Sequence, residues 1–228
     1  MYLPKHFAPP SPSSEALKSL IQEYPLAQVV TVDEQGQWVC NPIPLMLKGS
    51  LEAGSSLVGH VARANPLWRH EGSVLVVFTG PQAYVTPNAY ASKAEHHRVV
   101  PTYNYATVQV RGQLVAHDQT EVKLDVVSQL TNQFEQHQPK PWSVTDAPED
   151  YLQATLRAIV AFEIRIESVM AKFKLSQNRT VADRTGVMDY FASSVNDSDA
   201  AAMLKMMQAC DDSRDDGPTS NNPTSSKS

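Results

Sequence analysis

The sequence predicts a mainly β protein with flanking α-helices, and three observations support that prediction. Short runs of β-branched and aromatic residues alternate with polar residues, which is the period of half-buried strands. A few amphipathic stretches of helical period are interleaved between these runs. The chain has only 9 glycines and no Gly-rich loop, which argues against a Rossmann unit. Many short strands with few helices favour a closed or partly closed barrel.

The first half of the chain is predicted to open with a helix through Leu17, Leu20 and Ile21, capped by Ser13 or Ser14. Strand segments follow, with a short helical stretch at Asn65–His70 among them: Leu26–Val32, Gln37–Lys48, Ser56–Ala62, Ser73–Thr79 and Ala83–Thr86. Pro42 and Pro44 lie inside the second segment. Because proline donates no backbone hydrogen bond, this strand is expected at a sheet edge or beside a bulge. An edge close to the core is a natural place for a ligand to bind.

The second half alternates long strands with helices. The expected order is strand Thr107–His117, helix Thr120–Gln136, helix Glu149–Arg157, strand Ile159–Phe173 and helix Asp197–Gln208. From Asp211 onward no residue is apolar, so residues 210–228 are predicted to be a disordered acidic and polar tail. The remainder, residues 1–209, is predicted to form a single domain.

Composition narrows the possible functions. The 228-residue chain has a formal net charge of −5, which argues against a generally basic surface that coats nucleic acid. The start lacks the apolar core of a signal peptide, and no apolar run is long enough to span a bilayer. Cys40 and Cys210 lie far apart and are expected to be reduced thiols. These observations predict a cytoplasmic protein that is not embedded in a membrane.

The first candidate site is the segment His60-Val61-Ala62-Arg63-Ala-Asn65-Pro, where a strand gives way to a helix start. Backbone N–H groups at such a junction are expected to be unpaired and to favour anions. Arg63 adds a cation suited to phosphate, and Asn65 can cap the helix or donate to an oxygen. The alternative interpretation is a plain N-cap beside a surface arginine.

Two further segments carry candidate ligand contacts. Tyr103 and Asn104 combine an aromatic ring and an amide at a strand entrance, which suits a planar ring; a proline-shaped turn with core tyrosines is the alternative. Lys172 and Lys174 are two apart and share a strand face, which favours an anion between them or a solvated surface. From the residues alone, the chain is a barrel that can hold a phosphate-bearing ring compound.

Several segments together resemble the PaiB family of FMN-binding negative transcriptional regulators. They occur in family order over residues 1 to about 209. The matching segments are Met1-Tyr2-x-Pro4-x-His6-Phe7, Asn41–Leu45, His60–Trp68, Tyr84–Tyr90 with Ser92-Lys93, Val100–Tyr105 and Lys174–Arg179.

The resemblance implies a split β-barrel of the pyridoxamine-phosphate-oxidase type that works as a homodimer and binds FMN between its subunits. It implies phosphate and ribityl contacts from His60, Val61, Ala62, Arg63 and Asn65. The Pro42–Pro44 edge would flank the isoalloxazine, and Tyr103, Asn104, Lys174 and Gln177 would contribute from the partner subunit. Two positions depart from the family pattern: Ala89 stands where a large aromatic is usual, and Tyr103 where tryptophan is frequent.

Three functions follow from this resemblance. The first is a flavin-binding negative regulator of transcription, whose DNA affinity the negative charge predicts to be weak and strongly salt-dependent. The second is an FMN-dependent oxidoreductase, in which the flavin supplies the chemistry. The third is a haem-binding split barrel, with His6, His60 or His70 as an iron ligand.

Overall fold

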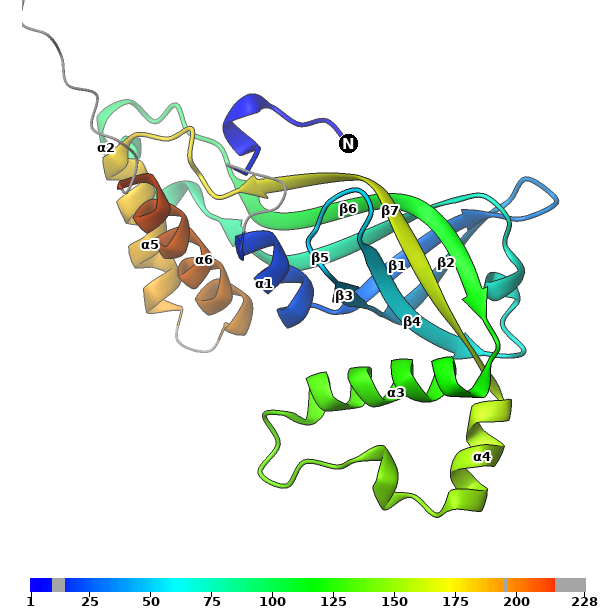
Figure 1. Ribbon diagram of the computed structural model, residues 1–228. Helices are drawn as coiled ribbons and strands as arrows, with labels where there is room; N and C mark the ends of the chain where they lie inside the picture. Colours follow the sequence, from blue (N-terminus) through cyan, green and yellow to red (C-terminus); the bar gives the residue numbers. More distant parts are fainter. Residues whose placement is uncertain (10–14, 195–196, 216–228) are drawn as a thin grey trace, which may run out of the picture. The chain divides into compact units, whose positions relative to one another are not determined.

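The computed structural model describes residues 1–9, 15–194 and 197–215 of the chain, and a seven-stranded antiparallel sheet dominates it. The sheet is curled into a half-barrel, with the strand order β2-β1-β5-β6-β7-β4-β3 (Figure 1). Its strands are β1 Leu26–Val32, β2 Trp38–Pro44, β3 Met46–Lys48, β4 Ser56–Ala62, β5 Ser73–Val85, β6 Thr102–His117 and β7 Ile159–Lys174. The prediction of a mainly β fold with flanking helices is therefore confirmed.

Helices and single 3-10 turns connect the strands. The helices are α1 Glu15–Glu23, α2 Lys93–His96, α3 Thr120–Glu135, α4 Glu149–Arg157, α5 Val181–Ser193 and α6 Ser198–Asp215. The 3-10 turns are η1 Lys5–Phe7, η2 Pro66–Arg69, η3 Pro87–Ala89 and η4 Val144–Asp146. None of the helices in the described ranges is long and apolar enough to span a bilayer.

The chain divides into two compact units. The first unit comprises Met1–Gly80 and Ala106–Phe173, and the second comprises Pro81–Tyr105 and the described residues from Lys174 onward. The strands β5, β6 and β7 contribute residues to both units. A single domain over residues 1–209 remains a prediction.

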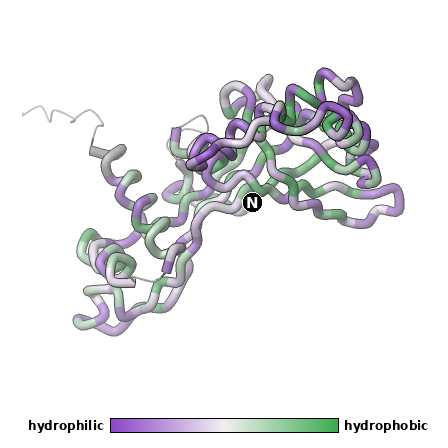
Figure 2. The backbone as a smooth tube through the Cα atoms, turned by 90° about the horizontal axis from the view of Figure 1, so that it is seen from below, coloured by the Kyte–Doolittle hydropathy of each residue, from purple (hydrophilic) through white to green (hydrophobic). Residues whose placement is uncertain are grey.

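The core of the first unit follows the alternation seen in the sequence. Phe162 and Ile164 of β7 are fully buried, whereas Arg165 and Glu167 are exposed. The helix α3 packs on β4, where its Val126 and Leu130 form an apolar cluster with Ala161 of β7. Figure 2 shows the same pattern along the tube, with apolar residues recurring in the strands and hydrophilic residues in the loops.

The predicted edge strand is confirmed for β2, but its predicted end at Lys48 is wrong, because Met46–Lys48 form the separate strand β3 at the other end of the strand order. β2 lies at one end of the sheet and pairs antiparallel with β1, from Leu26 opposite Pro44 to Val32 opposite Trp38. Pro42 and Pro44 are both exposed. Because an edge strand has a side without a neighbour, the absent proline N–H groups cost no hydrogen bond of the sheet there.

Two predicted strands are in fact one. The segments Ser73–Thr79 and Ala83–Thr86 form the continuous β5, which passes through Gly80-Pro81 without a break. Gly80 is required by packing, because an added Cβ would lie 2.8 Å from Cδ1 of Leu20 in α1. This glycine serves a close helix–strand contact and does not end the strand.

The helix α5 was not predicted from the sequence. Four of its side chains are buried, and two of these, Asp183 and Arg184, are charged, so the apolar period is weak. Thr180 caps the helix, since its Oγ1 accepts a hydrogen bond from Asp183 N at 3.2 Å. The Thr-x-x-Asp spacing was the available signal for this helix start.

The last helix extends beyond its predicted end at Gln208 and reaches Asp215. Asp211 is held there by an ion pair of 2.7 Å to Nη2 of Arg184. The first residues of the predicted tail, 210–215, are therefore helical. Residues 216–228 lie outside the described residues, as do the predicted caps Ser13 and Ser14.

Candidate functional site

The predicted anion site lies at the corner where β4 ends. β4 pairs with β7, with His60 opposite Ala161 and Ala62 opposite Ile159. Val61 is buried and Ala62 is exposed. Asn65 then caps η2, and its side chain accepts a hydrogen bond from Leu67 N at 3.0 Å. The strand-to-helix junction predicted from the sequence is therefore present.

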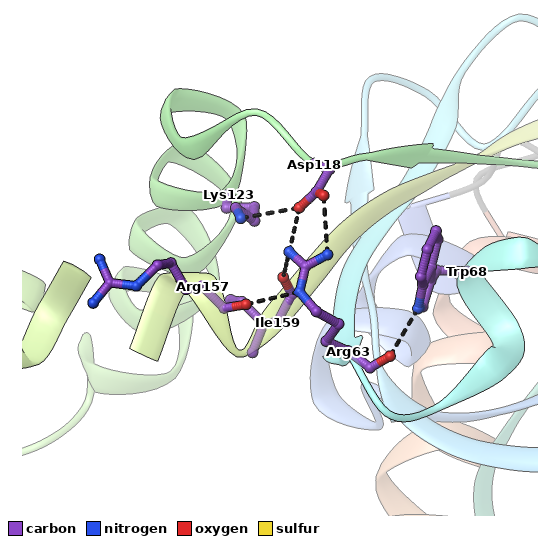
Figure 3. A network of polar contacts seen from close by, with 6 residues as sticks. All are labelled: Arg63, Trp68, Asp118, Lys123, Arg157 and Ile159. Atoms are coloured by element: carbon purple, nitrogen blue, oxygen red, sulfur yellow. Dashed lines mark hydrogen bonds and ion pairs between the residues drawn. The ribbon is translucent and has the colours of Figure 1, made fainter. Parts of the chain in front are cut away.

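Arg63 is the centre of a polar network at this corner (Figure 3). Its guanidinium forms a two-pronged ion pair with Asp118, at 3.0 Å from Nη1 to Oδ2 and 2.5 Å from Nη2 to Oδ1. Nε donates to the carbonyl of Arg157 at 2.8 Å, and Nη2 also donates to the carbonyl of Ile159 at 3.2 Å. These four bonds engage four of the five guanidinium N–H groups, which leaves one N–H on Nη1 for a ligand.

Lys123 completes the network from the first turn of α3. Its Nζ donates to Oδ1 of Asp118 at 3.1 Å, and its side chain is only 4% exposed. Two cations thus share one carboxylate, so the cluster carries a net charge of +1 (two positive, one negative). The hydrogen bonds from Arg63 and Lys123 hold the pKa of Asp118 far below its usual range, and the bond to Asp118 raises the pKa of Arg63. Asp118 and Arg63 therefore stay charged at neutral pH.

Neither Asp118 nor Lys123 was identified from the sequence. Asp118 lies 55 positions beyond Arg63, in the turn between β6 and α3. Lys123 sits on the helix face that also carries the buried Val126 and Leu130. A lysine on an apolar helix face was the available signal, because a buried ammonium requires a partner.

The expectation of unpaired backbone N–H groups at the corner was wrong for three of them. Arg63 N donates to Ala158 O at 2.8 Å, and Asn65 N donates to Ala62 O at 2.9 Å. Leu67 N is bound by the cap Asn65. Backbone carbonyls of neighbouring segments and the Asn65 cap satisfy these donors. The turn η2 is also too short to act as an anion-binding helix start.

His60 offers an unused polar atom at the same corner. Its Nδ1 is buried and has no hydrogen-bond partner among the described residues. Burial lowers the pKa of His60, because desolvation penalises the imidazolium. A neutral imidazole with an unsatisfied buried nitrogen is ready to donate to or accept from a bound molecule.

The structure brings the corner and the proline edge together. Asn65 Nδ2 donates to Oδ1 of Asn41 at 2.9 Å, and Asn41 precedes Pro42 on β2. The cap of η2 therefore fixes the β2 edge beside the end of β4. The sequence predicted both parts, and the asparagine pair that joins them is a finding of the structure.

The other four predicted contacts belong to the second unit. Asn104 is fully buried, and both ends of its amide are used, by Ser176 Oγ at 3.1 Å and Met207 Sδ at 3.6 Å. Lys174 donates to Thr102 Oγ1 and Tyr103 O, and Gln177 Oε1 accepts from Leu175 N at 2.6 Å. Tyr103 presents an exposed ring, edge-on to Tyr84. Of these four, Tyr103 has the most accessible side chain for a ligand.

Comparisons with known proteins agree with the fold. A family model described as "Putative FMN-binding domain" matches residues 1–168. The chain is 30% identical to "Protease synthase and sporulation protein PAI 2" of Bacillus subtilis, over 91% of this chain and 97% of the relative.

Two solved structures share the architecture. The FAD and heme binding protein from Mycobacterium smegmatis superimposes with a TM-score of 0.51 at 21% identity, over 72% of each chain. The flavocytochrome Anf3 from Azotobacter vinelandii superimposes with a TM-score of 0.52 at 15% identity, over 75% of this chain and 69% of that chain. The predicted split β-barrel is thus confirmed.

Proposed function

This chain belongs to the family described as "Putative FMN-binding domain", and we propose that it binds FMN at the corner where β4 ends. The observation that carries the proposal is the buried Nδ1 of His60, which has no partner among the described residues; the net positive charge around Arg63, three positions further along the chain, supports it. The family match over residues 1–168 includes this corner and the β2 edge.

Each corner residue has a distinct task in the proposal. Arg63 offers its remaining Nη1 N–H and its charge to the phosphate, while Asp118 and two carbonyls fix the guanidinium in place. His60 supplies a hydrogen bond from a neutral ring. Val61, Ala62 and Asn65 line the ribityl chain, and the Pro42–Pro44 edge flanks the isoalloxazine with apolar surface.

Tyr103, Asn104, Lys174 and Gln177 of the second unit differ in what they can offer a ligand. Asn104 is buried and its amide is committed within its own chain. Lys174 and Gln177 lie beyond the residues that the family model matches. Tyr103 has a ring that is 55% exposed, which suits stacking against a flavin. We propose that Tyr103, with Lys174 and Gln177, contributes from a second copy in a homodimer.

Bound FMN would supply electron-transfer chemistry that no side chain of this protein provides. The protein's own contribution is orientation and charge. Arg63 and Lys123 place positive charge at the corner, and the imidazole of His60 stays neutral because burial lowers its pKa. The exposed β2 edge at Pro42 and Pro44 would flank the bound ring.

Titration with FMN tests the proposal, and riboflavin is the matched control because it lacks only the phosphate. We expect the purified protein to show flavin absorption bands, or to gain them with FMN, and to bind riboflavin at least about tenfold more weakly. Equal affinity for the two would exclude a phosphate role for the corner. A Soret band without flavin bands would favour the haem-binding function instead.

We further propose that the flavin-bound protein is a negative regulator of transcription in the cytoplasm. The formal net charge of −5 makes any direct DNA contact weak, so we expect gel shifts that disappear as salt is raised. Sequence-selective binding that survives high salt would contradict this expectation. Multiple-turnover oxidation of NAD(P)H by the FMN-loaded protein would instead support the oxidoreductase alternative.

A further inference from the structure

The second unit contains a cavity that the proposed FMN corner does not use. We call it the tyrosine pocket; its volume is about 700 Å³, and it is a shallow depression that is widely open to solvent. The end of β5, the turn η3 and the helix α5 form its walls. The lining residues are Tyr84, Thr86, Asn88, Ala89, Gly186, Asp189, Tyr190 and Ser193.

Small residues bring the walls of the tyrosine pocket together. A Cβ added to Gly186 would lie 2.2 Å from the carbonyl oxygen of Ala89, so the backbone of α5 lies directly against η3. Asp183 fixes the start of α5, because its carboxylate accepts from Ser92 N at 2.8 Å and from Ser92 Oγ at 2.9 Å. The side chain of Ala89, which also lines the pocket, is only a methyl group.

The charge and rings of the pocket favour a cation. Asp189 is the only charged residue in the lining, and no hydrogen bond or ion pair joins its carboxylate to another residue of the described ranges. Tyr84 and Tyr190 are 45% and 36% exposed. Tyrosine rings attract cations through their negative faces, and a nearby carboxylate adds to that attraction.

The described residues that line the pocket include no cationic residue that could pair with a bound anion. The neighbouring ammonium of Lys93 lies outside it and donates to Oδ1 of Asn88. Hydroxyl groups of the pocket are also partly committed, since Ser193 Oγ donates to Tyr190 O at 2.8 Å. These residues therefore do not suit the recognition of a phosphate, which the proposed FMN site requires.

We propose that the tyrosine pocket binds a small organic cation, a quaternary or aromatic ammonium, between Tyr84, Tyr190 and the carboxylate of Asp189. The carboxylate neutralises the charge, and the rings supply apolar and cation–π contact. Tyr84 lies edge-on to Tyr103, which the FMN proposal uses, whereas Asp189 and Tyr190 belong to the tyrosine pocket alone. The two proposals can therefore fail separately.

Ligand-observed NMR with choline and N-methylpyridinium tests this proposal on the full chain. We expect saturable binding of at least one of these cations in the millimolar range. The neutral isostere of choline, 3,3-dimethylbutan-1-ol, should bind at least about fivefold more weakly, because it lacks the charge. Asp189→Asn should weaken cation binding by about fivefold or more and leave the FMN titration unchanged.

Glu95→Gln is the matched control, because Glu95 is an exposed acid of the second unit that does not line the pocket. It should leave cation binding as in the parent protein. Absence of saturable binding for both cations would overturn the proposal. Equal binding of choline and its neutral isostere would also overturn it. An equal effect of Asp189→Asn and Glu95→Gln on cation binding, or a loss of FMN affinity in Asp189→Asn, would do the same.

Discussion

Arg63→Ala is expected to weaken FMN binding roughly ten- to a hundredfold, the range for a lost hydrogen bond to a charged group. The variant removes the guanidinium that offers its Nη1 to the phosphate, and it leaves Asp118 paired with Lys123 alone, so the net charge of the cluster falls from +1 to 0. Isothermal titration with FMN measures the change. A parallel thermal unfolding experiment checks that the variant is folded at the titration temperature.

Asp118→Asn separates a ligand role of Arg63 from a purely structural one. This substitution keeps both cations and changes the net charge of the cluster from +1 to +2, because the single carboxylate is removed. If Arg63 contacts the phosphate, Asp118→Asn should bind FMN at least as tightly as the parent protein. If the network serves only to hold the corner together, both variants should weaken FMN binding alike. The latter result would remove Arg63 from the proposed site.

Gly112→Ala is expected to cost about 3 kcal/mol or more of unfolding free energy, at the upper end of overpacking effects. Gly112 lies on β6, where an added Cβ would be 2.2 Å from the carbonyl oxygen of Arg165 and 3.0 Å from Cγ2 of Ile164 on β7. A backbone oxygen inside a sheet cannot move aside without disturbing its neighbours. Urea denaturation measures the effect, with the midpoint and slope compared between variants.

Gly36→Ala is the control for this prediction. Gly36 has a φ of 77°, but a Cβ added there meets no atom within 4 Å. The control should therefore cost only the backbone strain of a left-handed residue, about 1–2 kcal/mol. Equal costs at the two positions would show that contact with Arg165 is not what requires glycine at position 112.

The network around Arg63 ties three segments of the chain together at this corner. One guanidinium joins the end of β4 to the turn after β6 and to the α4–β7 junction, through Asp118 and the carbonyls of Arg157 and Ile159. Lys123 adds a buried ammonium to the same carboxylate. The corner is thus pre-organised, which lowers the ordering cost of binding a ligand there.

Local pattern in the sequence was enough to determine most of the fold. The strand Ser56–Ala62 and the helix Glu149–Arg157 agree residue for residue with prediction. Alternation in β7 placed Phe162 and Ile164 in the core, and the prolines of β2 placed it at an edge. These features depend on the period of the apolar side chains and on the N–H donor that proline lacks. Both can be recognised within a single segment of the sequence.

Only the tertiary structure decided what the candidate residues contact. The partner of Arg63 lies 55 positions away, and nothing near Arg63 in the sequence marks Asp118 as that partner. The helix α5 was missed because it buries Asp183 and Arg184, which a periodicity argument assigns to solvent. Ion pairs and close backbone contacts act between segments that meet only after folding, so residue type and spacing along one segment do not determine them.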